Sequence, residues 1–136
     1  MAALTRNRDT KARSGDITEP PVKGAAEIFA GALVAVDANG YAVPGSTATT
    51  LKGLGRAEQH VDNSAGADGD MSVRVGRGIY RFANSAAADE ITLSDVGADC
   101  YIVDDQTVAA TDGTGTRSVA GKVHDVDAQG VWVKFS

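Results

Sequence analysis

The sequence predicts a mainly β protein: a small β-barrel or β-sandwich built from hairpins, with an extended N-terminal arm and at most one or two short helices. Its 136 residues include 15 Val and 16 Gly but only 5 Leu, and Val and Gly favour strands and tight turns over helical cores. Short apolar runs also recur on either side of polar turns, at a spacing typical of a sandwich or barrel. The length suits one domain with a core that needs no disulfides.

The first expected hairpin has its turn at Asn39-Gly40, between apolar runs at 33–36 and 41–43. Asn-Gly readily adopts the positive φ angles that a two-residue hairpin turn requires. Similar arrangements of apolar run, polar turn and second apolar run occur twice more, at 101–109 and at 122–135. We therefore expect three hairpins, whose uneven spacing argues against a solenoid repeat.

Two further segments are expected to contain strands. Residues 51–61 form a run broken by Gly with charged residues interspersed, and residues 71–75 alternate between polar and apolar, as in a half-buried strand. The glycines within 76–78 predict a bulge or bend before the next apolar run at 79–82.

The last strand is expected to present two different faces. Alternation places Val131, Val133 and Phe135 on one face, and Trp132 and Lys134 on the other.

Evidence for helix is confined to one part of the chain. Residues 86–95 include helix formers, and residues 94–97 match one capped turn that ends at a Gly. One or two short helices are therefore expected here.

The net charge of −5 conceals an uneven distribution. Residues 1–23 hold five basic and three acidic side chains, a sum of +2, whereas residues 24–136 hold eight basic and fifteen acidic ones, a sum of −7. The two prolines at 20–21 exclude helix and favour an extended chain. We interpret residues 1–23 as an extended basic arm on a β-rich domain over 24–136. The arm is either a disordered terminus without a role or a segment that orders against a partner or a neighbouring subunit.

Composition argues against several classes of protein. No apolar run approaches the ~20 residues of a membrane span, and no apolar stretch follows the charged N-terminus, as a secretory signal would require. Cys100 is the single cysteine, which excludes an intrachain disulfide and is more typical of a buried thiol than of a nucleophile. A pI near 4.8 disfavours nucleic-acid binding by the whole domain.

Catalytic and metal-binding motifs are also missing from the sequence. His60 and His124 lie in expected strands without compact metal-ligand spacing. The acidic loop at 62–70 fails the EF-hand pattern, since Val73 occupies the twelfth position; a calcium site of another kind stays open as an alternative. No nucleophile elbow, Walker loop or dinucleotide fingerprint occurs. We expect no enzyme activity, no cofactor and no metal.

A series of short motifs extends in order through residues 54–133. They are LGRAE at 54–58, DN at 62–63, GADGD at 66–70, VRV at 73–75, GIYRFAN at 78–84, LSDVG at 93–97, YIVDDQTV at 101–108, AGKV at 120–123 and GVWV at 130–133. In their order and density these motifs resemble the small structural proteins encoded in head-gene clusters of tailed bacteriophages, especially Mu-like ones. Those proteins are capsid decoration, or cement, proteins.

The resemblance implies a β-rich virion protein that is added to the outside of an assembled icosahedral phage head. Such a protein bridges major capsid subunits and stabilises the shell against the pressure of packaged DNA. The implied partners are the major capsid protein and the chain itself, as a homotrimer or alternatively a homodimer, with no direct contact to nucleic acid or membrane. The implied location is the outer surface of the head, after synthesis in the bacterial host cytoplasm.

Two sets of residues are candidates for this function. We expect the arm to contact acidic patches of the capsid, and the subunit interface to use exposed apolar side chains. The arm set is Arg6, Arg8, Lys11 and Arg13, and the interface set is Ile28, Phe29, Trp132 and Phe135.

Two other functions stay open. One is a carbohydrate-binding or adhesin-like β-module, such as the base of a head fibre, which would place Trp and Tyr in a shallow surface groove. The other is an OB-type single-strand nucleic-acid binder, suggested by the arginines and aromatics interleaved at 74–82. The body charge of −7 argues against the second.

Overall fold

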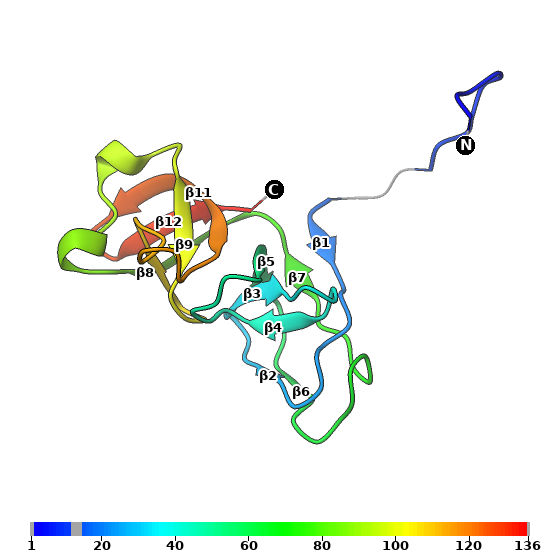
Figure 1. Cartoon of the computed structure of the whole chain (residues 1–136), viewed down its shortest axis with the longest axis horizontal. Helices are drawn as coiled ribbons and strands as arrows, with labels where there is room; N and C mark the ends of the chain where they lie inside the picture. Colours follow the sequence, from blue (N-terminus) through cyan, green and yellow to red (C-terminus); the bar gives the residue numbers. More distant parts are fainter. Residues whose placement is uncertain (1, 12–14, 136) are drawn as a thin grey trace.

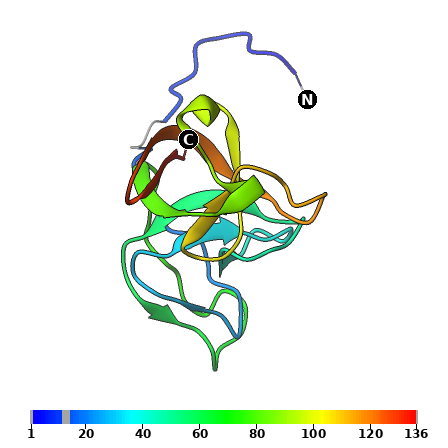
Figure 2. The same ribbon diagram turned by 90° about the vertical axis from the view of Figure 1, so that its left-hand side faces the viewer.

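Short strands dominate the described part of the chain, residues 2–11 and 15–135, in this computed structural model. A five-stranded sheet lies beside a closed five-stranded barrel, and a small two-stranded sheet extends from the far side of the five-stranded sheet (Figures 1 and 2). The expected mainly β fold with a barrel and hairpins is therefore confirmed. No helix in the described residues is long and apolar enough to span a membrane.

The five-stranded sheet has the order β1-β7-β5-β3-β4, and all its neighbouring strands are antiparallel. The expected hairpin joins β3 to β4, but its turn is longer than the predicted two residues, because residues 37–41 separate the strands. Of the Asn39-Gly40 pair only Gly40 has a positive φ, +87°, and the Asp37 carboxylate accepts backbone hydrogen bonds from Asn39 and Tyr41. The strands are β1 (Ile17–Thr18), β3 (Leu33–Val36), β4 (Ala42–Pro44), β5 (Lys52–Ala57) and β7 (Val75–Gly76).

The barrel contains the other two expected hairpins, β9–β10 and β11–β12. A parallel pairing of β10 with β8 closes it. The strands are β8 (Ile79–Asn84), β9 (Asp99–Ile102), β10 (Thr107–Ala109), β11 (Val119–Asp127) and β12 (Gly130–Lys134).

The expected strand over 51–61 is divided between two sheets. Its first part is β5, whereas its end forms β6 (Val61–Asp62), which pairs with β2 (Glu27–Ile28). Residues 58–60 separate the two strands.

The alternating segment 71–75 has the predicted burial but less strand than expected. Val73 and Val75 are fully buried, while Ser72 and Arg74 are exposed. Only Val75 and Gly76 form a ladder, because residues before them bond to the N-terminal segment instead: Val73 N–H donates to the Pro20 carbonyl oxygen.

Gly76 ends β7 and Gly78 forms the predicted bend before β8, where the chain passes from the sheet into the barrel. A Cβ atom on Gly76 would lie 2.1 Å from the Tyr80 hydroxyl and 2.2 Å from a Glu58 carboxylate oxygen, so a larger residue would displace these two side chains. Two 3₁₀ turns, η1 (Ala87–Asp89) and η2 (Leu93–Asp95), are the short helices expected near residue 90.

Each sheet encloses its own cluster of buried side chains, and β3 belongs to both. Leu33 and Ala35 pack into the barrel cluster, while Val34 packs into the cluster under the five-stranded sheet. The last strand has the predicted faces, with Val131, Val133 and Phe135 buried, Trp132 half-buried and Lys134 exposed.

The N-terminal region expected as an arm over 1–23 has two parts in the structure. Residues 17–22 belong to the body: β1 pairs with β7, Val22 is fully buried, and Pro21 forms a bridge with Ser72. Residues 2–11 are exposed throughout, contain no strand and lead away from the body (Figure 1).

Candidate functional site

The arm residues predicted to bind a partner are exposed. Arg6, Arg8 and Lys11 face solvent, and Lys11 forms an ion pair with Asp9 in which both side chains are more than four-fifths exposed. An exposed pair of this kind contributes little to stability and leaves the cation available to a partner. Arg13 lies outside the described residues.

The four apolar residues predicted for a subunit interface do not form one patch. Ile28 is fully buried in β2, and Phe135 is buried against Phe82 and Tyr80 at ring-centroid distances of 6.0 and 6.4 Å. Both belong to the core of this chain. Phe29, which directly follows β2, and Trp132, in β12 of the barrel, remain at the surface.

Phe29 is 56% exposed and stacks on the ring of His60, with centroids 5.1 Å apart and planes nearly parallel. His60 Nε2 lies 2.8 Å from a carboxylate oxygen of Glu27. The His60 ring therefore has both a stacking partner and a polar partner within the chain. Among the described residues no group of three or more His, Cys, Asp or Glu side chains is arranged to hold a metal ion.

Trp132 lies on the outer surface of β12 and is held by polar neighbours. Its indole N–H donates to the Asp127 carboxylate at 2.9 Å, and the Arg81 guanidinium lies 5.5 Å from the ring centroid. Asp127 also accepts backbone hydrogen bonds from Gln129 and Gly130. These donors, with the indole N–H first, lower the pKa of the Asp127 carboxyl.

The stretch 74–82 does not present the series of open aromatic faces on which successive bases stack. Phe82 is buried in the barrel, and the Arg56 guanidinium covers one face of Tyr80 at 4.1 Å from the ring centroid.

Cys100 is buried as well, and burial raises the pKa of its thiol to about 11. A thiol in this environment is a poor nucleophile at neutral pH.

In the acidic loop 62–70 the carboxylates accept hydrogen bonds from backbone N–H groups. Asp62 accepts from the N–H of Ser64, Asp68 from that of Gly24 and Asp70 from that of Ala67. These carboxylates shape the loop and do not converge on a common point.

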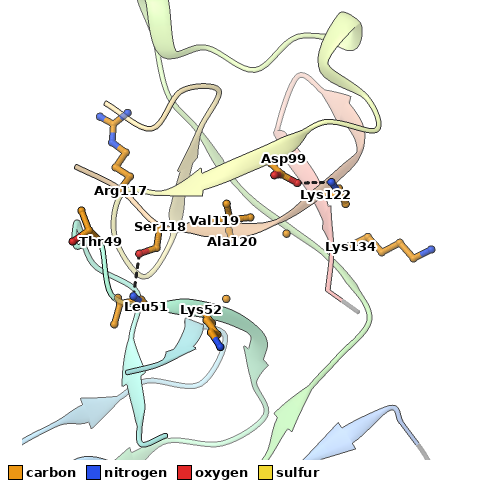
Figure 3. Close-up of a pocket in the computed structure, with 12 residues that line it drawn as sticks. Thr49, Leu51, Lys52, Asp99, Arg117, Ser118, Val119, Ala120, Lys122 and Lys134 are labelled. Carbon is orange, nitrogen blue, oxygen red and sulfur yellow. Dashed lines mark hydrogen bonds and ion pairs between the residues drawn. The ribbon is translucent and has the colours of Figure 1, made fainter. Parts of the chain in front are cut away.

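A basic groove lies where the five-stranded sheet meets the barrel, between β5 and β11 (Figure 3). It is open to solvent and has a volume of about 500 Å³. Its lining residues are Thr49, Leu51, Lys52, Gly53, Asp99, Arg117, Ser118, Val119, Ala120, Gly121, Lys122 and Lys134.

Glycine makes the floor of this groove possible. A Cβ atom on Gly53 would lie 2.0 Å from the carbonyl oxygen of Ala120, so the backbones of β5 and β11 are in direct contact there. On one wall, the Ser118 hydroxyl donates to the Ala48 carbonyl oxygen at 2.6 Å and accepts from the Leu51 N–H at 3.0 Å. The groove is therefore a fixed feature of the junction between the two sheets.

Sequence reasoning did not identify this groove. Its lysines come from three strands, β5, β11 and β12, and the register of β11 with β12 places Lys122 directly opposite Lys134. That placement becomes visible only once the barrel is assembled.

Comparison of the chain with protein-family models, with curated proteins and with solved structures finds no match.

Proposed function

We propose that this protein decorates the outer surface of an icosahedral phage head, where it bridges major capsid subunits and stabilises the shell against internal DNA pressure. The observation that carries this proposal is an exposed, basic, extended arm on an acidic β-rich body. A clamp that binds the assembled shell but not its loosened form stabilises the shell by mass action.

The arm suits a binding role on a large surface. An extended segment wraps a wide area of its partner and becomes ordered on binding. The binding affinity is therefore spread over many residues, each of which contributes a little. Its basic side chains, Arg6, Arg8, Lys11 and Arg13, are complementary to acidic capsid patches. Many copies on one lattice add avidity, which allows each individual contact to be weak.

The body supplies a second set of contacts in this proposal. Phe29 and Trp132 are the two predicted interface residues at the surface, and aromatic side chains are frequent anchors of protein interfaces. They would join copies of the chain, as a homotrimer or alternatively a homodimer, or join a copy to the capsid.

The test is co-sedimentation with isolated heads of the encoding phage, followed by cryo-EM of the decorated particles. A chain that lacks residues 2–11 keeps β1 and Val22, so we expect it to fold and to bind heads less well. A triple variant, R6Q/R8Q/K11Q, should show the same loss, whereas the charge-preserving variant R6K/R8K should bind like the original chain. Equal decoration by the full chain and the truncated chain would rule out the role of the arm.

A second candidate function is carbohydrate binding by an adhesin-like module, favoured by one observation. Trp132 and Tyr80 line the same shallow groove of about 410 Å³, together with Arg56 and Arg81. Aromatic rings pack against sugar faces, and arginine binds sugar hydroxyl or carboxylate groups through its planar donors. Binding of this protein to glycans in the absence of capsid, monitored by Trp132 fluorescence, would support this function; a flat titration in glycan solutions would oppose it.

A further inference from the structure

The groove between β5 and β11 concentrates positive charge on an acidic body. Four of the eight basic side chains of residues 24–136 line it, Lys52, Arg117, Lys122 and Lys134, against one of the fifteen acidic ones, Asp99. The lining therefore carries +3 by formal charge, while the body as a whole carries −7. A cleft lined by one sign of charge focuses the electrostatic field and attracts the opposite charge.

Two of these cations are already neutralised within the chain. Lys122 pairs with Asp99, as Figure 3 shows, and Arg117 pairs with Asp89 and donates to the Thr111 carbonyl oxygen. The Lys122–Asp99 pair raises the pKa of the Lys122 ammonium group.

Lys52 and Lys134 have no acidic partner among the residues that the structure describes. Lys134 also faces Lys122 across the β11–β12 ladder. Asp99 already offsets the charge of Lys122, so the exposed ammonium groups of Lys52 and Lys134 are the charges available to an acidic ligand.

The rest of the lining indicates which acidic ligand fits. Leu51 and Val119 add apolar surface, and Val119 is 40% exposed. The lining has no aromatic side chain on which a base could stack, which disfavours a single-stranded nucleic acid. An extended polypeptide with acidic and small apolar side chains matches both the charge and the apolar part of the groove.

We propose that the groove between β5 and β11 binds an extended acidic segment of a partner protein through Lys52 and Lys134. In the assembled particle that partner is the major capsid protein, so the identity of the partner rests on the proposed function. The groove would then be a second attachment point, on the folded body and separate from the arm.

The direct test uses a fluorescein-labelled peptide of alternating Glu and Val and measures fluorescence anisotropy with the full chain. We expect saturable binding that weakens as salt is added, because exposed charges are screened. A peptide with Gln in place of Glu should not bind. The double variant K52E/K134E should lose about tenfold or more in affinity.

The control is K23E/R74E, which changes the net charge equally and lies outside the groove. Unlike K52E/K134E, it removes two ion pairs, Lys23–Asp37 and Arg74–Glu19, so its folding is checked as well. It should bind the Glu-Val peptide like the original chain, provided that both variants show the same Trp132 emission and thermal unfolding as the original. Equal loss in both variants would reduce the effect to net charge and overturn the proposal.

Three further outcomes would also overturn it. The first is tighter binding of an oligothymidylate than of the peptide. The second is a change in the oligomeric state of the free chain when K52E/K134E is introduced, because this would assign the groove to a second copy of the chain. The third concerns heads: if the original chain and K52E/K134E decorate heads equally, the groove is not an attachment point although the proposed function stands. If the original chain does not bind heads but binds the peptide through Lys52 and Lys134, the proposed function fails and only the groove remains.

Discussion

Gly53 is the residue at which the five-stranded sheet and the barrel come closest. Its missing side chain leaves room for the Ala120 carbonyl oxygen, which would lie 2.0 Å from a Cβ atom. Since that atom belongs to the backbone of a paired strand, it cannot rotate away. One strand must shift to accept any larger residue.

Gly53→Ala should therefore lower the free energy of unfolding by about 1–3 kcal/mol, the typical range for overpacking. Urea denaturation followed by the fluorescence of Trp132, the single tryptophan, measures this change. Gly15→Ala is the control, because a Cβ atom there meets nothing within 4 Å, and it should stay within about 0.5 kcal/mol. An equal effect of both substitutions would refute the close contact.

Cys100 is a second single residue whose reactivity tests the packing of the barrel. The thiol is buried, and that burial raises its pKa to about 11, so at neutral pH it is both inaccessible and protonated. A thiol reagent should leave the native chain unmodified and label one site per chain in guanidinium. Stoichiometric labelling of the native chain would show that the barrel opens readily.

At the scale of elements, features that depend on a few consecutive residues were predicted, whereas contacts between distant segments of the chain were not. The turn at Asn39-Gly40 and the two faces of residues 131–135 were predictable because a turn and an alternation each depend on a few consecutive residues. The parallel pairing of β10 with β8 has no local signal, because it depends on strands that are separated by two 3₁₀ turns and by β9. The groove has no local signal either, because Lys52 and Lys122 line it together only when the sheet and the barrel are assembled.

The β11–β12 hairpin depends on one carboxylate. Hydrogen bonds from the Trp132 indole and from two backbone N–H groups lower the pKa of Asp127, so the folded chain holds the ionised form more strongly than the unfolded chain does. The stabilisation is complete above about pH 4, the ordinary range of an unfolded Asp, and is lost as the pH falls through the lower folded pKa. Backbone and side-chain donors lower the pKa values of Asp37, Asp62 and Asp89 in the same direction.

Asp127→Asn should flatten part of this acid dependence, because the variant has no carboxyl group to protonate at that turn. Thermal unfolding of both chains from neutral pH down to about pH 3 measures the difference, and the emission of Trp132 should shift at every pH as its indole loses a charged acceptor. Asp105→Asn is the control, because it removes a carboxyl group from a different turn, outside the β11–β12 hairpin, and should keep the original profile. Parallel acid profiles for Asp127→Asn and the original chain would contradict this account.

The whole molecule has two buried clusters, and β3 connects them. Leu33 and Ala35 point into the barrel cluster while Val34 points into the other, and the Gly53–Ala120 contact adds a second connection. Because alternate side chains of one strand support both clusters, loss of either cluster removes packing from the other. The sheet and the barrel should therefore unfold as one cooperative unit.

Val34→Ala tests this coupling, because the substitution lies in the cluster under the five-stranded sheet whereas the probe, Trp132, lies on the barrel. Removing two buried methyl groups should lower the free energy of unfolding seen by Trp132 by about 2 kcal/mol. Val96→Ala removes the same groups at a position that is 49% exposed and should change it by less than about 0.5 kcal/mol. If Val34→Ala leaves the Trp132 transition in place while amide exchange accelerates in β3 and β5, the two parts unfold separately. In the proposed capsid-binding role, separate unfolding would allow the body to open between the arm and the barrel under load, which a cooperative body prevents.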